Sequence, residues 1–214
     1  MVKTKKKKGI LVGDYLKAEY HPLTQVDKEI SDIFENEIDI TSTEDYNMLL
    51  SQNLIRFDLC ILYVDRWEEE VPEKLIKSLL DFVENGGGLL VIHNGISFQS
   101  NGQFAELIGG KFTGHPAYTN LEIRITEPKH VIMQGIKEFT IDDEPYRYDF
   151  NGIKEKEILF QYMHEGNIYP AAWTRVIGNG RLVYLMPGHN IDSFRNEAYS
   201  KIILRSGKWL LGEI

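Results

Sequence analysis

The chain has 214 residues, of which 43% are hydrophobic and 26% are charged, and its formal net charge is −8. This composition is typical of one globular domain and argues against a disordered or membrane-spanning class. An acidic protein repels the phosphate backbone, so we expect no nucleic-acid partner. The single cysteine, Cys60, excludes an internal disulfide and a cysteine-based metal cluster.

The amino terminus is basic, with lysines at positions 3 and 5–8, and only a short apolar stretch follows. A signal peptide needs an apolar region of roughly 7–15 residues, and a membrane-spanning helix needs roughly 20. We therefore predict a cytoplasmic protein that does not associate with membranes. We also predict a flexible basic tail over residues 1–8 and a single domain over residues 9–214.

In the first half of the chain, short apolar runs alternate with segments of helical periodicity. Buried strands that alternate with helices are typical of a parallel, doubly wound sheet. Strands are predicted at residues 9–13, 37–41, 58–64 and 88–93. Helices are predicted at residues 22–34, at 43–50 with Ser42 or Thr43 as the cap, and from Pro72 to the Asn85-Gly86 pair.

The second half of the chain is predicted to add antiparallel strands. Residues 121–126 and 158–163 alternate between apolar and polar side chains, as half-exposed strands do. Two further predicted strands flank Gly178-Asn179-Gly180, which is a hairpin signal; they cover residues 171–177 and 181–186. A helix over residues 199–211 closes the chain. The predicted fold class is α/β, a three-layer sandwich with a mostly parallel, doubly wound sheet plus antiparallel additions.

Candidate functional residues follow the predicted parallel strands, because ligands of such sheets bind beyond the carboxyl ends of the strands. His21 comes after the first strand, and His93 and Asn94 end the fourth. In related hydrolases the turn after such a strand carries the nucleophile, yet no cysteine or G-x-S-x-G motif occurs here. Cys60 lies within an apolar strand and is interpreted as a buried, inert thiol. Covalent acyl chemistry is therefore not expected.

Four of the six histidines lie beside glycine or proline in predicted loops: His21, His93, His115 and His189. Glu144, in the acidic run 142–144, supplies a carboxylate that could reach the same edge of the sheet. Imidazoles with a carboxylate suit proton transfer near neutral pH or binding of Zn²⁺. Their spacing matches no compact metal motif, and ordinary loop histidines beside a solvated acidic turn are the alternative interpretation.

The chain carries an ordered set of characteristic segments: GGGLLVIH at 86–93, FAELIGGKFTGHP at 104–116, IMQGI at 132–136, DEPY at 143–146, PAAWT at 170–174, GNGRLVY at 178–184 and GH at 188–189. With this set the chain resembles the ThuA-like (trehalose utilisation) family over nearly its whole length. The resemblance implies a flavodoxin-like, class I glutamine amidotransferase-like fold and a link to the metabolism of trehalose or related disaccharides. It also implies that His93 replaces the catalytic equipment at the turn, and that His115, Glu144 and His189 line the same pocket.

The resemblance leads to a functional hypothesis with a sugar or keto-sugar derivative as substrate. His93, His189 and Glu144 are predicted to be catalytic, with the two histidines as proton donor and acceptor. Substrate contacts are predicted for His21, His115, Asn94 and Tyr146. No cofactor is required by the sequence, but Zn²⁺ or another divalent metal on His93, His115 and His189 is an open alternative.

A second hypothesis is a non-catalytic sugar-binding or regulatory module of the same fold. Both hypotheses imply a small-molecule sugar as the partner, and a homo-oligomer is an additional expectation. Whether the protein is an enzyme is left open between them, with a hydrolase, lyase or isomerase as the enzyme classes. Glutamine amide transfer is not expected, because it needs a cysteine at the turn.

Overall fold

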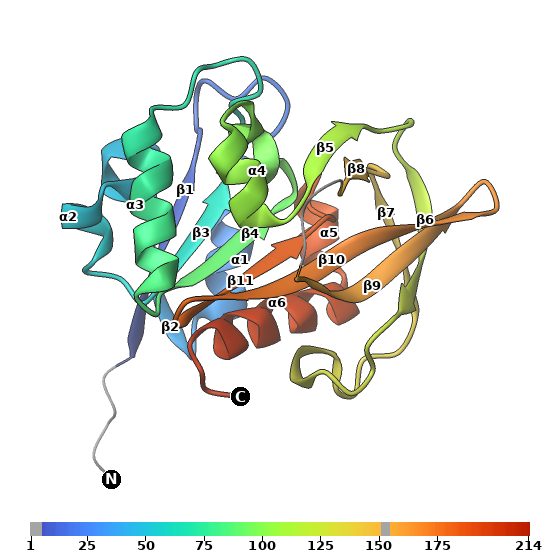
Figure 1. The fold of residues 1–214 in the computed structure, drawn as a ribbon. Helices are drawn as coiled ribbons and strands as arrows, with labels where there is room; N and C mark the ends of the chain where they lie inside the picture. The colour runs from blue at the N-terminus through green and yellow to red at the C-terminus, as the bar shows by residue number, and fades with distance from the viewer. Residues whose placement is uncertain (1–5, 151–154) are drawn as a thin grey trace, which may run out of the picture.

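The computed structural model describes residues 6–150 and 155–214, which form an α/β fold in three layers (Figure 1). Five strands form the parallel part of its main sheet: β1 (Lys7–Gly13), β2 (Ile38–Thr43), β3 (Leu59–Tyr63), β4 (Gly88–Ile92) and β11 (Gly180–Leu185). Every residue of β3 and β4 is buried. Strands covered on both faces must be apolar throughout, which is why these runs stood out in the sequence.

Four antiparallel strands extend this sheet: β6 (Thr119–Ile125), β7 (Phe139–Asp143), β9 (Glu157–His164) and β10 (Asn167–Ile177). The complete order is β2-β1-β3-β4-β11-β10-β9-β6-β7. The hairpin between β10 and β11 turns at Gly178-Asn179, with Ile177 paired to Gly180. A separate two-stranded sheet consists of β5 (Lys111–Gly114) and β8 (Arg147–Asp149). The predicted fold class, a parallel α/β sheet with antiparallel additions, is confirmed.

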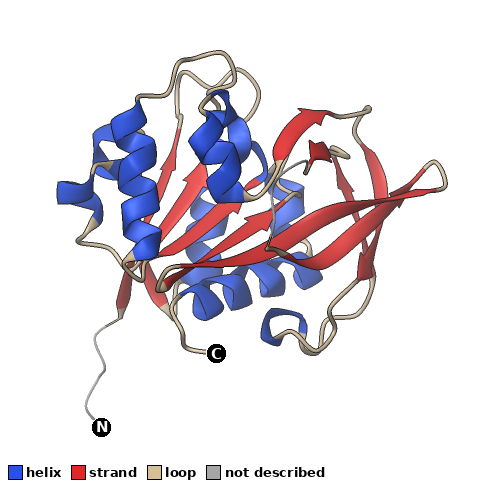
Figure 2. Cartoon of the chain, in the orientation of Figure 1, coloured by secondary structure: helices blue, strands red, loops and turns tan. Residues whose placement is uncertain are grey.

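Helices cover both faces of the sheet, as the view coloured by secondary structure shows (Figure 2). One face carries α2 (Ser51–Leu54), α3 (Glu73–Glu84) and α4 (Gly102–Ile108), and the other carries α1 (Asp27–Phe34), α5 (Ile191–Arg195) and α6 (Glu197–Leu210). Four 3-10 helices complete the described structure: η1 (Leu23–Gln25), η2 (Tyr46–Leu49), η3 (His93–Ser100) and η4 (Val131–Met133). The core therefore lies in two layers, one on each side of the central strands.

Two predicted helices are shorter than the sequence suggested. The segment 22–34 breaks at Val26, whose φ of −126° separates η1 from α1. The segment 43–50 is a 3-10 helix, and its cap is Asp45, whose side chain accepts a hydrogen bond from the Asn47 backbone N–H. The prediction of Ser42 or Thr43 as the cap was wrong, because both residues lie at the end of β2.

The predicted amino-terminal tail is also shorter than expected. Residues 1–5 lie outside the described residues, but Lys7 and Lys8 already belong to β1. The Lys7 ammonium lies 3.0 Å from a carboxylate oxygen of Asp58, and the Lys8 backbone N–H donates to the other oxygen at 2.9 Å. These contacts fix the first strand to the start of β3. No helix in the described part of the chain is long and apolar enough to cross a membrane.

Candidate functional site

A cluster of polar side chains lies at the carboxyl edge of the parallel strands and draws on four separate segments. His21 lies in the connection after β1, His93 follows β4 directly, and His189 follows β11 after a short turn. Because β1, β4 and β11 run parallel, their carboxyl ends meet at one edge of the sheet. Glu144 follows β7, whose last residue, Asp143, accepts a hydrogen bond from the Gly188 backbone N–H at 2.8 Å. That bond ties the antiparallel extension back to this edge.

We call His21, His93, Glu144 and His189 the histidine–glutamate cluster, since each offers one ligand atom within 4.8 Å of the others. The Nε2 atom of His21 lies 3.2 Å from Nε2 of His93 and 3.2 Å from Nδ1 of His189. The Oε2 atom of Glu144 lies 3.2 Å from His93 Nε2, 3.3 Å from His189 Nδ1 and 3.6 Å from His21 Nε2. Four potential metal-ligand atoms thus converge on one point.

The orientation of two imidazoles is set by hydrogen bonds on their far side. His93 Nδ1 lies 2.6 Å from the carbonyl oxygen of Met186, and a carbonyl can only accept, so Nδ1 carries the proton. His21 Nδ1 faces Oδ1 of Asp65 at 3.5 Å. Asp65 is held in turn by the Trp67 indole N–H at 2.8 Å. Both rings therefore direct Nε2 toward the centre of the cluster.

His93 itself has an unusual backbone conformation. Its φ is +48°, in the left-handed region that residues other than glycine rarely adopt. Such strain costs of order 1–3 kcal/mol and persists only where the surroundings require it. Here it turns the chain sharply from β4 into η3 and directs the imidazole across the sheet edge, where Tyr146 stacks on it with ring centroids 4.2 Å apart.

The charges in the cluster affect one another strongly. Burial disfavours the ionised form of Glu144, but its contacts with the imidazoles of His189, His21 and His93 outweigh burial and hold its pKa well below the ordinary value. Burial lowers the pKa of His93. Burial also acts to lower the pKa of His21, but the hydrogen bonds to Asp65 and Glu144 outweigh it and raise the pKa overall. The arrangement keeps Glu144 ionised and His93 neutral.

The structure brings His115 only to the margin of this cluster. Its Nε2 lies 3.8 Å from Oε1 of Glu144, the carboxylate oxygen that faces away from the three imidazoles, and its Nδ1 donates to the carbonyl of Pro116 at 2.8 Å. Of the predicted metal set, His93 and His189 belong to the cluster and His115 lies outside it. His21 and Glu144 lie where a shared ligand would have to lie, and His115 does not.

Two predicted substrate-binding residues are buried. Asn94 is fully buried at the start of η3, and its amide atoms have no hydrogen-bond partner among the described residues. Tyr146 is also buried and packs behind His93 and Phe112. Both side chains therefore lie beneath the more exposed Glu144 and His189, and their predicted substrate contacts stay predictions.

Sequence reasoning did not select three residues that shape the site. Asp65 orients His21, Asp143 anchors the segment around Gly188, and the Tyr118 ring lies 5.2 Å from that of His189 on the exposed side. Asp65 directly follows the predicted strand 58–64, which was the available signal, whereas Asp143 ends β7, a strand that the sequence did not predict. Tyr118 lies in a loop with no comparable signal.

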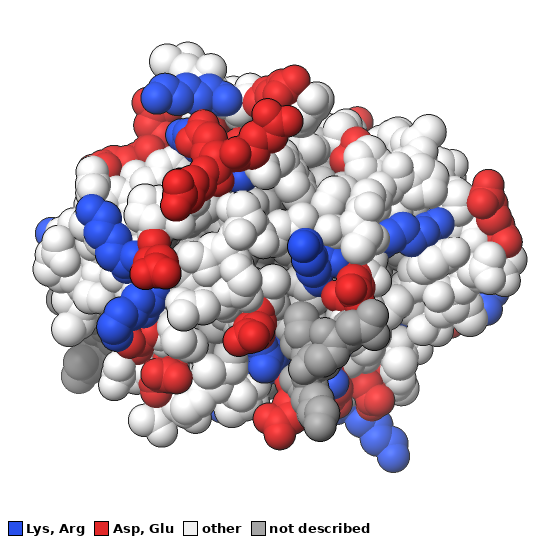
Figure 3. All heavy atoms as spheres, turned by 45° about the horizontal axis from the view of Figure 1, so that its top comes forward, with Lys and Arg blue, Asp and Glu red and all other residues white. Residues whose placement is uncertain are grey.

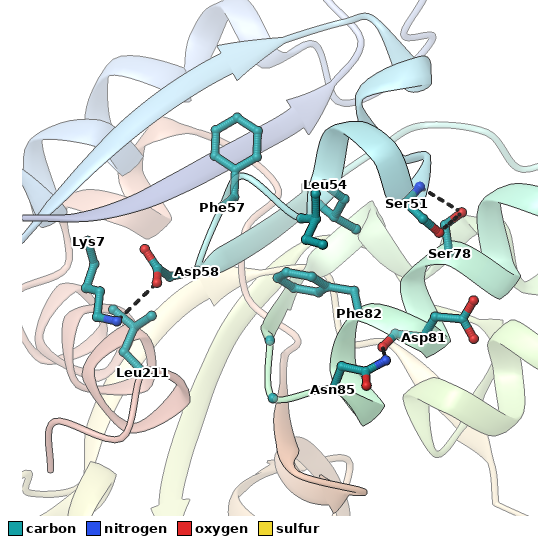
Figure 4. Close-up of a pocket in the computed structure, with 13 residues that line it drawn as sticks. Lys7, Ser51, Leu54, Phe57, Asp58, Ser78, Asp81, Phe82, Asn85 and Leu211 are labelled. Atoms are coloured by element: carbon teal, nitrogen blue, oxygen red, sulfur yellow. Dashed lines mark hydrogen bonds and ion pairs between the residues drawn. The ribbon is translucent and has the colours of Figure 1, made fainter.

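One cavity among the described residues lies away from this cluster. It has a volume of about 350 Å³ and is lined by residues at the amino ends of the strands, including Lys7, Asp58 and Gly87 (Figure 4). Phe82 projects into it from α3, and Leu54 and Phe57 border it. Because its walls lie at the opposite end of the strands from the histidine–glutamate cluster, it does not contribute to that cluster.

These observations define a class of protein: an α/β fold with a mostly parallel sheet whose carboxyl edge carries imidazoles and a carboxylate. The single cysteine has no part in this edge, because Cys60 is fully buried within β3 and burial raises the pKa of its thiol. The chain belongs to the ThuA family, described as trehalose utilisation, whose family profile matches residues 11–210.

Solved structures show the same fold at low sequence identity. A ThuA-like protein from Parabacteroides merdae has a TM-score of 0.81 at 17% identity, with 98% of this chain and 92% of that chain covered. One from Bacteroides uniformis has a TM-score of 0.80 at 15% identity, covering 98% and 93%. A cytoplasmic protein from Salmonella typhimurium has a TM-score of 0.69 at 11% identity, covering 95% and 98%. A comparison with curated proteins gave no match.

Proposed function

We propose that this ThuA-family protein is an enzyme of carbohydrate metabolism that transfers a proton on a sugar derivative, with an oxidised disaccharide as the substrate class. The observation that supports the proposal is the convergence of His21, His93, His189 and Glu144 at the sheet edge where this fold places its chemistry. Imidazole and carboxylate groups held in fixed orientations are suited to general acid–base catalysis. The family description, trehalose utilisation, supports a sugar as the substrate.

The groups that can reach a substrate differ from those buried beneath them. The side chains of Glu144, His189 and His115 are 12%, 29% and 35% exposed, whereas those of His21 and His93 are 4% and 0% exposed. A proton donor or acceptor must come within hydrogen-bond reach of the reacting atom. We therefore assign substrate contact to the exposed three, and we propose that His93 acts through its neighbours rather than as a direct proton donor.

The proposed reaction begins beside a ketone. A C–H bond next to the carbonyl breaks, its proton passes to a basic group at the exposed side of the cluster, and the electron pair forms an enediolate. The enediolate then either takes a proton back, or expels a leaving group on the adjacent carbon where the substrate carries one. Neither outcome needs an oxidant or a nucleophilic thiol, which fits the buried Cys60.

A deuterium-exchange experiment tests this proposal without knowledge of the final product. Trehalose oxidised to the ketone at carbon 3 is incubated with the protein in D₂O, and NMR follows loss of the proton signal at the neighbouring carbons. The wild type should exchange these protons faster than buffer alone, and Glu144→Gln and His189→Ala should slow exchange by at least about 100-fold, the range of one acid–base group. His164→Ala, outside the cluster, should match the wild type. Equal exchange in all four proteins would refute the proposal.

A sugar-binding module without catalysis is the second candidate, because the absence of a nucleophile fits it equally well. Isothermal titration with trehalose and with the oxidised sugar, with product analysis of the same samples, separates the two. Binding in the absence of any exchange or conversion would favour the module.

The same proposal covers partner and location. A small-molecule sugar is the proposed partner, and nucleic acid is not, since the face in Figure 3 carries many acidic side chains and no broad basic area among its described residues. We propose a cytoplasmic location, supported by the name of the Salmonella typhimurium relative.

A further inference from the structure

We propose that His21 Nε2, His93 Nε2, His189 Nδ1 and Glu144 Oε2 form a binding site for one divalent transition-metal ion, and that Zn²⁺ fits it best. The inference goes beyond the proposed function and does not rest on it, because a metal can bind here whether or not the protein acts on a sugar. Imidazole nitrogens and a carboxylate oxygen are ligands that Zn²⁺ prefers.

The distances between the four atoms support this assignment. Zn²⁺ holds nitrogen and oxygen ligands at about 2.0–2.1 Å, so neighbouring ligand atoms of a regular tetrahedron lie about 3.3–3.4 Å apart. Five of the six distances that join these atoms are 3.2, 3.2, 3.2, 3.3 and 3.6 Å, and the sixth, between His93 Nε2 and His189 Nδ1, does not exceed 4.8 Å. An ion at the centre would therefore find five of the six ligand separations within a few tenths of an ångström of the tetrahedral value.

The direction of the lone pairs is the second argument. His93 Nδ1 donates to Met186, and His21 Nδ1 faces the Asp65 carboxylate, so neutral rings present an unprotonated Nε2. These two Nε2 atoms face each other at 3.2 Å, and a carboxylate oxygen of Glu144 lies 3.2 Å from one and 3.6 Å from the other. Lone pairs directed at one point repel one another, and a cation at that point removes the repulsion.

The outer contacts are those of a metal site. A carboxylate behind His21 and a carbonyl behind His93 fix the ring tautomers, the arrangement that metal-bound histidines commonly have. Asp143 holds the backbone of Gly188 and of Glu144 with hydrogen bonds of 2.8 Å each. Three of the four ligands are thus oriented or anchored by buried groups that do not themselves face the ion.

The exposure of the ligands indicates from which side the ion is accessible. His21 and His93 are buried, and Glu144 and His189 are partly exposed beside Tyr118. A further ligand, from water or a sugar oxygen, would enter on that side. A bound divalent ion supplies Lewis-acid polarisation of such an oxygen. His115 remains outside the ligand set, since it approaches Oε1 of Glu144, at 3.8 Å, and not the Oε2 atom that the three imidazoles share.

Direct metal titration tests this inference. The chain is stripped with a chelator, Zn²⁺ is titrated against a chromophoric competitor, and Co²⁺ is added separately as a spectroscopic probe. We expect one ion per chain and the intense visible absorption of low-coordinate Co²⁺. His189→Ala and Glu144→Ala should weaken Zn²⁺ affinity by more than about 100-fold, the upper range for loss of an outer-sphere partner. His115→Ala should change it less than about 3-fold.

The variants keep the inference falsifiable. His189 and Glu144 are partly exposed, so their alanine variants should retain the wild-type circular dichroism spectrum, which is recorded for each protein. A wild type that binds Zn²⁺ and Co²⁺ no more tightly than His189→Ala would overturn the assignment. Loss of binding in His115→Ala, with binding intact in Glu144→Ala, would overturn it in favour of a different ligand set. Neither result depends on any sugar, so the proposed function is tested separately.

Discussion

At the scale of single residues, Asp65 has the clearest effect on the cluster. Its carboxylate lies between the ring of His21 and the indole of Trp67, and it also accepts the backbone N–H groups of Tyr20 and His21. Burial alone would raise its pKa, but these contacts, with His21 first, lower the pKa from 3.8 to about 2. The lowered value links folding stability to pH.

This link predicts a loss of stability in acid. A carboxyl whose pKa is lower in the folded state stabilises the fold above its unfolded pKa, and this contribution disappears as the pH falls through the folded value. For Asp65 the window runs from about pH 4 to about pH 2, and solvent screening leaves about 1–2 kcal/mol. Urea unfolding of metal-free protein at pH 6 and pH 2.5 measures it. The loss in free energy of unfolding between these two pH values should be smaller in Asp65→Asn. In Asp39→Asn, a control at an exposed carboxylate, it should equal the wild-type loss. Identical drops in all three proteins would contradict the assignment.

Gly188 provides a second test at this scale. Its φ is +152°, and a Cβ atom added there would lie 2.8 Å from Cβ of His93. Gly114 also has a positive φ, +132°, but an added Cβ would meet nothing within 4 Å. We predict that Gly188→Ala and Gly114→Ala both lose about 1 kcal/mol or more to backbone strain. Only Gly188→Ala should also displace His93 and weaken Zn²⁺ binding, by about 10-fold or more.

The comparison between these two variants isolates the contact with His93. Urea unfolding gives the free energy that each variant loses to backbone strain, and the competition titration gives its affinity for Zn²⁺. If Gly114→Ala weakens Zn²⁺ binding as much as Gly188→Ala does, the effect comes from the backbone and not from the approach to His93.

Strand ends and loop signals made several site residues predictable. His21 and His93 follow strands predicted to be parallel, so their shared edge could be inferred from the sequence pattern. His189 follows a strand that was predicted only as half of an antiparallel hairpin, and its place at this edge depends on the parallel pairing of β11 with β4.

The sequence could not show which of the histidines point at one another, because that depends on the direction of each side chain. The hydrogen bonds to Asp65 and Met186 fix this direction for His21 and His93. The burial of Asn94 and Tyr146 could not be predicted, because a place in a turn or in a family motif does not report how deep a side chain lies.

At the scale of elements, buried strands were predictable and short exposed ones were not. The runs that became β3 and β4 are apolar along their whole length, since both of their faces are covered. Strands β5 and β8 have four and three residues and pair mainly with each other, so no periodicity could emerge. Strand β7 has five residues, too few for its alternation to be distinguished from a loop.

The end of β7 is also where one residue connects elements that are distant in the chain. Oδ2 of Asp143 accepts hydrogen bonds from the Gly188 N–H at 2.8 Å and the Ser193 hydroxyl at 2.6 Å. Its Oδ1 accepts the Glu144 N–H at 2.8 Å. The fully buried carboxylate thereby joins the end of β7 to the connection between β11 and α5.

We predict that Asp143→Asn destabilises the protein by about 3 kcal/mol, because an amide has one acceptor oxygen and its NH₂ group would face a buried N–H donor. Ser193→Ala, which removes one donor and leaves the carboxylate in place, should cost about 1 kcal/mol. Urea unfolding measures both. Zn²⁺ affinity should fall in Asp143→Asn and stay near the wild-type value in Ser193→Ala. A loss of stability in Asp143→Asn no larger than that in Ser193→Ala would show that the carboxylate does not connect these elements.

At the scale of the whole molecule, the histidine–glutamate cluster joins parts of the chain that are far apart in sequence. His21 and His189 are 168 positions apart, and their ring nitrogens lie 3.2 Å from each other. An ion held by both would link the first strand, the centre of the sheet and the segment before α5. In the unfolded chain the four ligands are dispersed, so the ion would bind the folded state far more tightly.

This difference predicts that Zn²⁺ stabilises the entire fold. At a free Zn²⁺ concentration about 100 times the Kd, binding to the folded state alone adds about 2.7 kcal/mol. For a domain of this size that corresponds to a rise in Tm of roughly 5–10 °C. Thermal unfolding of the chelator-treated protein, with and without Zn²⁺, measures the shift. His115→Ala should show the full rise and Glu144→Ala none. A rise of equal size in Glu144→Ala would mean that Zn²⁺ stabilises the protein from some other place on its surface.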